Sequence, residues 1–392
     1  MHWNRRKEQC IIYLDNAATS GKKPQTVYDA VSDALINHCG NPGRAGHRLA
    51  RSAGAIVENA RMQCAALFGA AEAGEISFAY NCTDALNMAV HGVLKPGDHV
   101  ITSCLEHNSV ARPLEYLKSR GVIDLTVLPA SVDTGVDPED VRKAFKANTS
   151  LVAVTHVSNV TGTVNDVSQI GAVCRENGVR LLVDAAQSAG NMILDVQEMN
   201  IDILAFPGHK ALFGPQGTGG LYVKKGIMLE PLKQGGTGSF SESLQQPQTV
   251  PDRYESGTLN VPGLSGLAAG IEFIRQNGID NIHKKEKELS EKLLKGFSEI
   301  PGVTVYSPSA GMERGAVVSI TLEGAEPQDI AMLLDSEFDI AVRAGLHCAA
   351  YTHRALGTDI NGGTVRFSPG YFTTDDDVEK CIDAVMMIAR EV

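Results

Sequence analysis

The sequence lacks several features that would point to whole classes of protein. It has no apolar run long enough to cross a membrane as a helix. Basic residues are also under-represented, since 35 Lys and Arg stand against 46 Asp and Glu and give a net charge of −11. This balance argues against nucleic acid or an anionic membrane as a partner. The basic amino terminus contains only the short apolar run IIYL, so we expect no signal peptide.

Paired cysteines are missing as well. Eight cysteines are scattered over 392 residues without any C-x-x-C pair, so neither a zinc site nor a thioredoxin-like motif is indicated, and we expect no metal. We therefore expect a reduced, cytoplasmic chain in which most thiols are buried. Cys39, Cys64 and Cys174 are predicted to be inert, small hydrophobic residues.

What the sequence does contain is an alternation of strand-like and helical segments. Seven apolar runs are mostly joined by helix-length segments, which favours an α/β fold with a largely parallel, seven-stranded sheet covered on both faces. The seventh run follows a short loop, so it can be antiparallel. The predicted strands are Glu75–Ala79, His99–Ser103, Asp124–Pro129, Leu151–His156, Arg180–Asp184, Asp202–Phe206 and Thr218–Val223.

The pattern changes after Pro262. A long polar loop at residues 234–260 precedes this point, and loops of that length are usually functional or interfacial. Two helices, several short strands and a closing helix follow, which predicts a smaller α+β domain. We expect a large domain of residues 21–262 and a small domain of residues 1–20 and 263–392.

A lysine follows the sixth predicted strand. The apolar run at residues 203–206 stops at Pro207 and Gly208, and Lys210 lies on the loop beyond them. Open α/β sheets bind ligands at this end of their strands. A desolvated lysine with a lowered pKa can act there as a Schiff-base nucleophile. A solvated loop lysine is the alternative for an isolated residue of this kind.

Other polar residues follow the ends of neighbouring predicted strands. A helix that begins near Thr83 would offer N–H groups to a phosphate, although an ordinary N-cap threonine is the alternative. Asp184 follows a buried run and needs a partner such as a protonated heteroaromatic nitrogen, unless it caps the next helix. His107 could stack on a planar ligand or be structural. Together with Lys210, these residues fit pyridoxal 5'-phosphate.

Six short motifs lie in these polar segments: HNS at 107–109, HVSNVTGT at 156–163, VDAAQSAG at 183–190, GHK at 208–210, ESGTLN at 255–260 and RAGLHCA at 343–349. In this order they resemble the class V aminotransferase group. Within that group they resemble the cysteine desulfurases of the short-loop, selenocysteine lyase-like type. The resemblance covers essentially the whole chain and implies a pyridoxal phosphate enzyme of fold type I.

The resemblance implies a role for each residue around the cofactor ring. Lys210 would form the covalent link to the cofactor, and Asp184 would keep the pyridine nitrogen protonated. Gln187 would bond the ring hydroxyl. His107 would stack on the ring and take part in catalysis.

It also implies residues for the phosphate and the substrate. Thr83 and His209 would bind the cofactor phosphate, and Thr258 would reach the phosphate of a neighbouring subunit, which implies a homodimer with shared sites. Asn159 and Arg366 would hold the carboxylate of the amino acid, with Arg366 suited to bidentate binding.

Cys348 is the predicted nucleophile. Arg343, which the resemblance also places at the substrate, and His347 are close to it in sequence. Nearby positive groups lower the pKa of a thiol from about 8.5 and supply the thiolate. The alternative is a bystander cysteine in another class V enzyme. Two positions depart from the family pattern: Pro207 replaces a phosphate-binding serine, and Leu346 replaces a histidine.

The leading interpretation is therefore a cysteine desulfurase. The amine of Lys210 would remove the α-proton of L-cysteine, and Cys348 would attack the substrate sulfur, keep it as a persulfide and release L-alanine. An acceptor protein would take the sulfur, for example for iron–sulfur cluster assembly. Selenocysteine lyase acting on L-selenocysteine, or an amino-transfer enzyme, is the alternative within enzymes. A sulfur-relay protein with a vestigial cofactor site is the alternative outside them.

Overall fold

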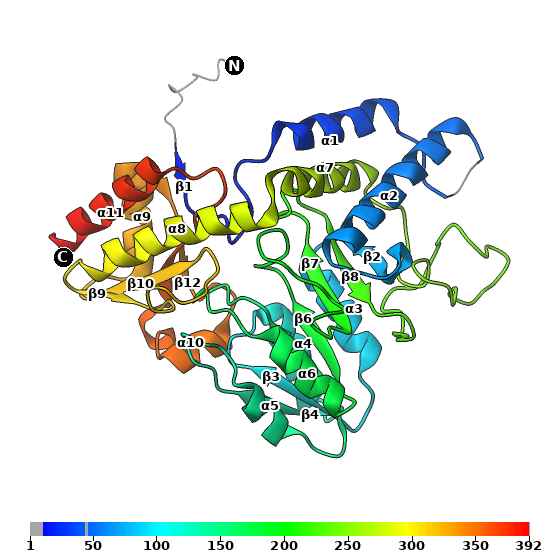
Figure 1. Cartoon of the computed structure of the whole chain (residues 1–392), viewed down its shortest axis with the longest axis horizontal. Helices are drawn as coiled ribbons and strands as arrows, with labels where there is room; N and C mark the ends of the chain where they lie inside the picture. The colour runs from blue at the N-terminus through cyan, green and yellow to red at the C-terminus, as the bar shows by residue number, and fades with distance from the viewer. Residues whose placement is uncertain (1–10, 44–45, 392) are drawn as a thin grey trace.

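The computed structural model describes residues 11–43 and 46–391, and Cys10 therefore lies outside it (Figure 1). A seven-stranded sheet forms the centre of the larger of two packed units. Its strands lie in the order β2 (Ile76–Ala79), β8 (Gly219–Val223), β7 (Ile203–Pro207), β6 (Arg180–Asp184), β5 (Thr149–Thr155), β3 (Asp98–Ser103) and β4 (Ile123–Leu128). In this sheet β8 runs opposite to the other six strands, which all point the same way. The predicted α/β fold is confirmed.

Helices cover both faces of this sheet. One face is covered by α1 (Gln25–Asn37), α2 (Arg48–Leu67), α5 (Pro138–Ala144), α6 (Val167–Glu176) and α7 (Val261–Asn277). The other face is covered by α3 (Cys82–Val93) and α4 (Asn108–Ser119). Successive side chains of a strand point to opposite faces. Leu181 and Val183 of β6 accordingly pack in the first core and Leu182 in the second.

The smaller unit is built on an antiparallel sheet of four strands, in the order β12 (Arg343–Gly345), β13 (Thr364–Phe367), β10 (Val318–Leu322) and β9 (Val303–Val305). Its helices are α8 (Ile279–Ser298), α9 (Pro327–Phe338), α10 (Ala350–Leu356) and α11 (Asp375–Ala389). Near the amino terminus, β1 (Ile12–Tyr13) pairs in parallel with β11 (Ile340–Ala341) of this unit. The described amino-terminal segment therefore contacts the small unit, although it lies far from it in sequence.

The predicted division of the chain at residue 262 stays a prediction. Helix α7 follows that point but packs against α1 and α2 of the large unit. Its residues Leu264, Leu267 and Ile271 belong to the same core as β6. The core of the small unit contains α8 residues only from Leu289 onward. No helix of the described part has both the length and the apolar character needed to cross a membrane.

Glu255, in the ESGTLN motif, anchors the long loop to the large unit. Its Oε1 and Oε2 accept hydrogen bonds from Arg61 Nη1 and Nη2 at 2.8 and 2.9 Å, and Oε1 also accepts one from the Phe78 N–H at 2.6 Å. The two charged side chains are only 5% and 6% exposed. The pair is thus a bidentate ion pair in the interior.

Replacing Glu255 with alanine should lower the free energy of unfolding by about 3–5 kcal/mol, because it leaves the buried Arg61 guanidinium with only the exposed Glu58 carboxylate, 3.5 Å from its Nε. Equilibrium urea denaturation measures this loss. Asp140→Ala is the matched control, since it breaks an exposed ion pair with Lys143 and should cost less than about 1 kcal/mol. Equal losses in the two variants would contradict a structural role for Glu255.

Candidate active site

One cavity of about 210 Å³ lies at the edge of the sheet where the parallel strands end. Because the carboxyl ends of these strands share one edge, loops far apart in sequence converge there. The small unit closes the cavity with side chains from β12 and β13. The predicted residues that line it are Thr83, His107, Asn159, Asp184, Gln187, His209, Lys210, Arg343 and Arg366.

Lys210 and Asp184 are the two charged residues that the large unit contributes to this cavity. No hydrogen bond or ion pair joins the Lys210 amine to any other residue within 11–43 and 46–391. Burial lowers the pKa of Lys210, and the Asp184 carboxylate opposes that shift only in part. A larger share of the amine is therefore neutral, which is the form that acts as a nucleophile or base.

The two carboxylate oxygens of Asp184 have different surroundings. Oδ1 accepts hydrogen bonds from the Ala186 N–H at 2.9 Å and from Cys82 Sγ at 3.4 Å. In the part of the chain that the structure describes, no group donates to Oδ2. The side chain is only 2% exposed, and burial raises the pKa of Asp184. An N–H donor from a ligand would satisfy the free oxygen.

His107 is both a helix cap and a wall of the cavity. It is the N-cap of α4, and its Nδ1 accepts a hydrogen bond from the Ser109 N–H at 3.1 Å. Burial, assisted by the positive charges of Lys210, Arg343 and other cations, lowers the pKa of His107 to about 3. The imidazole is therefore neutral and suited to stacking on a planar ring.

The amino-terminal end of α3 offers donors for an anion. Asn81, not Thr83, is the N-cap, since its Oδ1 accepts from the Asp84 N–H at 2.8 Å, so the N-cap alternative for Thr83 is wrong. Thr83 Oγ1 instead lies 2.7 Å from Ser109 Oγ. Hydroxyl groups beside a helix N-terminus suit a phosphate. Pro207, which also lines the cavity, can donate no backbone hydrogen bond there.

His209 and Gln187 connect the cavity to the amino-terminal segment. His209 Nδ1 lies 3.1 Å from Thr19 Oγ1, and burial is the main cause that lowers the pKa of His209 to about 4. Gln187 Nε2 donates to the Ala17 carbonyl at 3.0 Å. Thr258 differs from both, because it is exposed and lines a separate hollow.

Arg366 and Asn159 line the same cavity and are linked to each other. Arg366 Nη2 lies 2.8 Å from Asp15 Oδ1, and Nη1 donates to the Asn159 carbonyl at 3.1 Å. Arg366 Nε is buried and has no partner among the described residues. Asn159 Nδ2 donates to the His347 carbonyl at 2.8 Å, so it also holds the loop that carries the predicted nucleophile.

Cys348 is exposed and lies at the entrance to this site. It lines an adjoining hollow of about 490 Å³ together with His107 and Thr83. Its Sγ is 3.5 Å from Arg343 Nη2, and a guanidinium at that distance stabilises negative charge on sulfur. Its carbonyl accepts a hydrogen bond from the Asn108 N–H at 2.6 Å, which fixes the loop to the start of α4.

His347, the second residue predicted to be a cation beside Cys348, is uncharged. Burial is the main cause that lowers the pKa of His347 to about 2, so its imidazole is neutral, and the prediction of a positive group there is wrong. Its Nε2 lies 3.0 Å from the Thr364 carbonyl. His347 and Cys348 both have left-handed φ angles, of 46° and 57°, which non-glycine residues rarely adopt.

Most of the other described thiols are buried. Cys64, Cys82, Cys174 and Cys381 are buried, but Cys39 is exposed, which does not fit the prediction that it is an inert, small hydrophobic residue. It follows the end of α1, where sequence pattern does not determine exposure. Sequence reasoning did not single out Cys82, although it stands directly before Thr83. In the described ranges no cluster of His, Cys, Asp or Glu could hold a metal.

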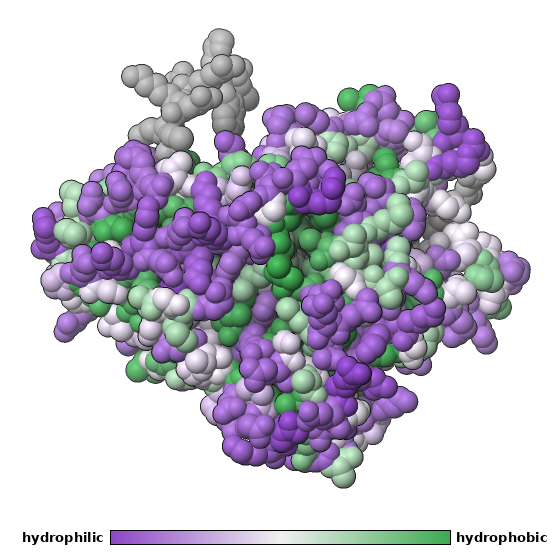
Figure 2. Space-filling view, viewed as in Figure 1, coloured by the Kyte–Doolittle hydropathy of each residue, from purple (hydrophilic) through white to green (hydrophobic). Residues whose placement is uncertain are grey.

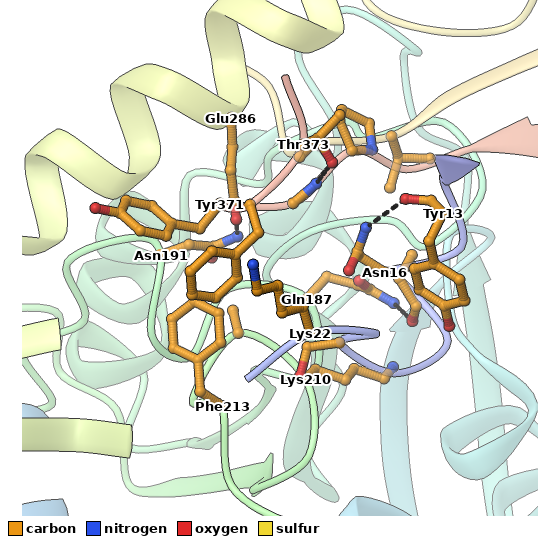
Figure 3. Close-up of a pocket in the computed structure, with 18 of the residues that line it drawn as sticks. Tyr13, Asn16, Lys22, Gln187, Asn191, Lys210, Phe213, Glu286, Tyr371 and Thr373 are labelled. Atoms are coloured by element: carbon orange, nitrogen blue, oxygen red, sulfur yellow. Dashed lines mark hydrogen bonds between the residues drawn. The ribbon is translucent and has the colours of Figure 1, made fainter. Parts of the chain in front are cut away.

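A larger cavity of about 450 Å³ adjoins the first between the two units and shares Gln187 and Lys210 with it. Figure 3 shows Lys210 and Glu286 at opposite sides of this cavity with Gln187 between them. Asn191 Nδ2 donates to Glu286 Oε2 at 2.8 Å. Figure 2 shows hydrophobic residues exposed in the hollow between the two units, whereas hydrophilic residues cover most of the viewed face.

Comparisons with known proteins agree over nearly the whole chain. The sequence model of the family Aminotransferase class-V matches residues 12–381. A probable cysteine desulfurase from Pyrococcus abyssi is 37% identical over 394 residues, covering 98% of this chain and 96% of that protein. One from Methanothermobacter thermautotrophicus is 36% identical, covering 94% of this chain and 92% of that protein.

Solved structures give the same result. An apo structure of a cysteine desulfurase from Thermococcus onnurineus superposes with a TM-score of 0.91 at 34% identity, covering 97% of this chain and 95% of that one. A cysteine desulfurase from Escherichia coli superposes with a TM-score of 0.87 at 29% identity, with the same coverage of 97% and 95%.

Proposed function

The chain belongs to the class V aminotransferase family, and we infer that it is a pyridoxal 5'-phosphate-dependent cysteine desulfurase that converts L-cysteine to L-alanine. The observation that carries this inference is the placement of Cys348. Its sulfur lies beside the Arg343 guanidinium, in a hollow that adjoins the cavity lined by Lys210 and Asp184. An enzyme that only transfers an amino group needs no cysteine at that point.

The residues in the cavity fit the cofactor. The Lys210 amine has no partner in residues 11–43 and 46–391, which suits a covalent link to an aldehyde. Asp184 Oδ2 lacks a donor within the same ranges, and a protonated pyridine nitrogen would supply one. The hydroxyl of Thr83, at the amino-terminal end of α3, and that of Ser109 in α4 suit the phosphate, and His209 lines the same cavity.

The surrounding residues would prepare the substrate for the reaction. Pyridoxal phosphate, when bound, withdraws electrons from the α-carbon of an amino acid attached to it. Asp184 would keep a proton on the ring nitrogen, and neutral His107 would stack on the ring. The Lys210 amine would take the α-proton, since its lowered pKa favours the neutral base. Gln187 would orient the cofactor from the side of the amino-terminal segment.

The substrate carboxylate would lie at the other end of the cavity. The Arg366 guanidinium, whose Nε has no partner among the described residues, would bind it, and Asn159 would supply an amide N–H. An ion pair between Asp15 Oδ1 and Arg366 Nη2 holds the guanidinium in place. This arrangement would direct the substrate side chain toward Cys348.

Cys348 would then act on the sulfur of the substrate. Its thiolate attacks that sulfur, a sulfur–sulfur bond forms, and the bond between sulfur and the β-carbon breaks with its electron pair left on carbon. Protonation of the β-carbon and return of the proton from Lys210 to the α-carbon complete L-alanine, and the sulfur remains on Cys348 as a persulfide. Arg343 stabilises the thiolate before the attack.

The proposal includes partners beyond the substrate. Thr258 is exposed and outside the cavity of its own chain, which suits a contact with the cofactor phosphate of a second subunit in a homodimer. The exposed Cys348 would pass its sulfur to an acceptor protein, for example for iron–sulfur cluster assembly. A cytoplasmic location remains a prediction from cysteine usage.

One observation favours selenocysteine lyase as the second candidate. Leu346 replaces a histidine beside the nucleophile, and the remaining His347 is neutral and turned toward Thr364. The loop therefore offers no charged histidine to assist a poor leaving group. The carbon–selenium bond is weaker than the carbon–sulfur bond, so its cleavage needs less assistance.

The holoenzyme should release L-alanine from L-cysteine in the presence of a thiol reductant and without any keto acid. Chromatography of the products and a sulfide assay measure the two products in equal amounts. A requirement for a keto acid would contradict the proposal and indicate aminotransfer. Turnover of L-selenocysteine alone would replace the desulfurase by the lyase. Absence of visible cofactor absorption would indicate a sulfur-relay protein.

A further inference from the structure

A second cysteine lies inside the cofactor cavity. Cys82 is the first residue of α3, lines the same cavity as Lys210, and is only 8% exposed. Its Sγ lies 3.4 Å from Asp184 Oδ1, within hydrogen-bond distance for sulfur. The proposed desulfurase chemistry assigns no role to this thiol.

The thiol and a backbone N–H occupy the same oxygen of Asp184. Oδ1 accepts from both Cys82 and the Ala186 N–H, whereas Oδ2 has no donor in the part of the chain that the structure describes. Cys82 is the only side chain in that part that donates to the Asp184 carboxylate. The two donors fix the plane of the carboxylate and leave one oxygen free to face the cavity.

Cys82 is held in its protonated form. Burial, followed by the charge of Asp184, raises the pKa of Cys82 well above that of a free thiol. It therefore remains an S–H donor and does not become a second nucleophile. Cys348, by contrast, is exposed and lies beside Arg343.

We propose that Cys82 is a positioning residue for Asp184: its S–H donates to Oδ1, stabilises the carboxylate and directs Oδ2 to the ring nitrogen of the cofactor. A hydrogen bond to the charged form of a carboxylate favours that form. An ionised Asp184 in turn keeps the proton on the ring nitrogen. This role rests on the proposed cofactor. It makes Cys82 a hydrogen-bond donor to Asp184, the residue that would keep the ring protonated and therefore electron-withdrawing.

The hydrogen-bond donor strength of the side chain at position 82 predicts the order of the effects of substitutions there. A thiol is a weak donor and a hydroxyl a stronger one, whereas alanine offers none. Serine at position 82 should therefore stabilise the carboxylate at least as well as cysteine. Alanine should raise the proton affinity of Asp184 and draw the proton away from the ring nitrogen.

The experiment compares Cys82→Ala and Cys82→Ser with Cys381→Ala as the matched control. Cys381 is a fully buried thiol in the small unit, in a different core. Each holoenzyme is loaded with pyridoxal phosphate labelled with ¹⁵N in the ring, and the nitrogen chemical shift is measured. We expect Cys82→Ala to shift the resonance toward that of an unprotonated ring. We expect Cys82→Ser to match the wild type or move further toward the protonated ring, and the control to be unchanged.

Two results would overturn the role. One is a wild-type resonance in Cys82→Ala, which would mean that the thiol only fills space. The other is a displacement of Cys82→Ser toward the unprotonated ring, and this second variant decides the matter if the alanine variant does not fold. If the wild type releases alanine and the nitrogen shift is the same in both position-82 variants, this role alone is rejected. An ordered response without alanine release would instead reject the desulfurase.

Discussion

Replacing Lys210 with alanine is expected to abolish alanine release from L-cysteine and to leave the cofactor without a covalent bond to the protein. Among the described residues, Lys210 is the only lysine that lines the cavity containing Asp184. Its loss removes both the link to the cofactor and the base for the α-proton. General base catalysis alone contributes about 10²–10⁴-fold in rate, so turnover should fall at least that far.

Borohydride reduction followed by peptide mass spectrometry measures the covalent link directly. In the wild type the reduced cofactor should be attached to Lys210, and in Lys210→Ala it should be attached to no residue. Lys22→Ala is the matched control, since Lys22 is an exposed lysine that lines only the adjoining cavity, and it should keep both link and turnover. A wild-type label found on another lysine would show that Lys210 has been misassigned.

Replacing Cys348 with serine should stop the reaction after the substrate has bound. The change keeps approximate size but replaces a thiolate with a hydroxyl that is hardly ionised near neutral pH. The bond from the Asn108 N–H to the carbonyl of residue 348 is made by the backbone, so the loop should stay in place. L-cysteine should still change the cofactor absorption, whereas alanine and persulfide should fall to background.

The controls separate a nucleophile from a space-filling residue. A near-isosteric change at a packing position costs little, so an inert Cys348 would leave turnover within a few-fold of the wild type. Cys39→Ser changes the other exposed cysteine of the described chain and should leave turnover unchanged. Alanine release at the wild-type rate by Cys348→Ser would exclude Cys348 as the nucleophile. Residual activity confined to L-selenocysteine would favour the lyase.

Much of the fold could be predicted from the order of apolar runs. The predicted strand Arg180–Asp184 coincides with β6, and the predicted Asp124–Pro129 differs from β4 by one residue at each end. Buried parallel strands are apolar throughout and end abruptly at polar residues, so they are visible in sequence. The same regularity predicted that residues after the strands would share one cavity, because parallel strands end at a common edge.

Other features depended on contacts that no local pattern reveals. The Cys82–Asp184 bond joins residues 102 positions apart, and the Arg366–Asp15 pair spans 351 positions. The charge of His347 was predicted wrongly, because burial makes it neutral and burial is a property of the folded chain. Sequence by itself determined which residue types stand at the ends of the strands. Only the tertiary structure decided which of them touch and which keep their charge, since distances and desolvation arise when the chain folds within each unit and the two units pack together.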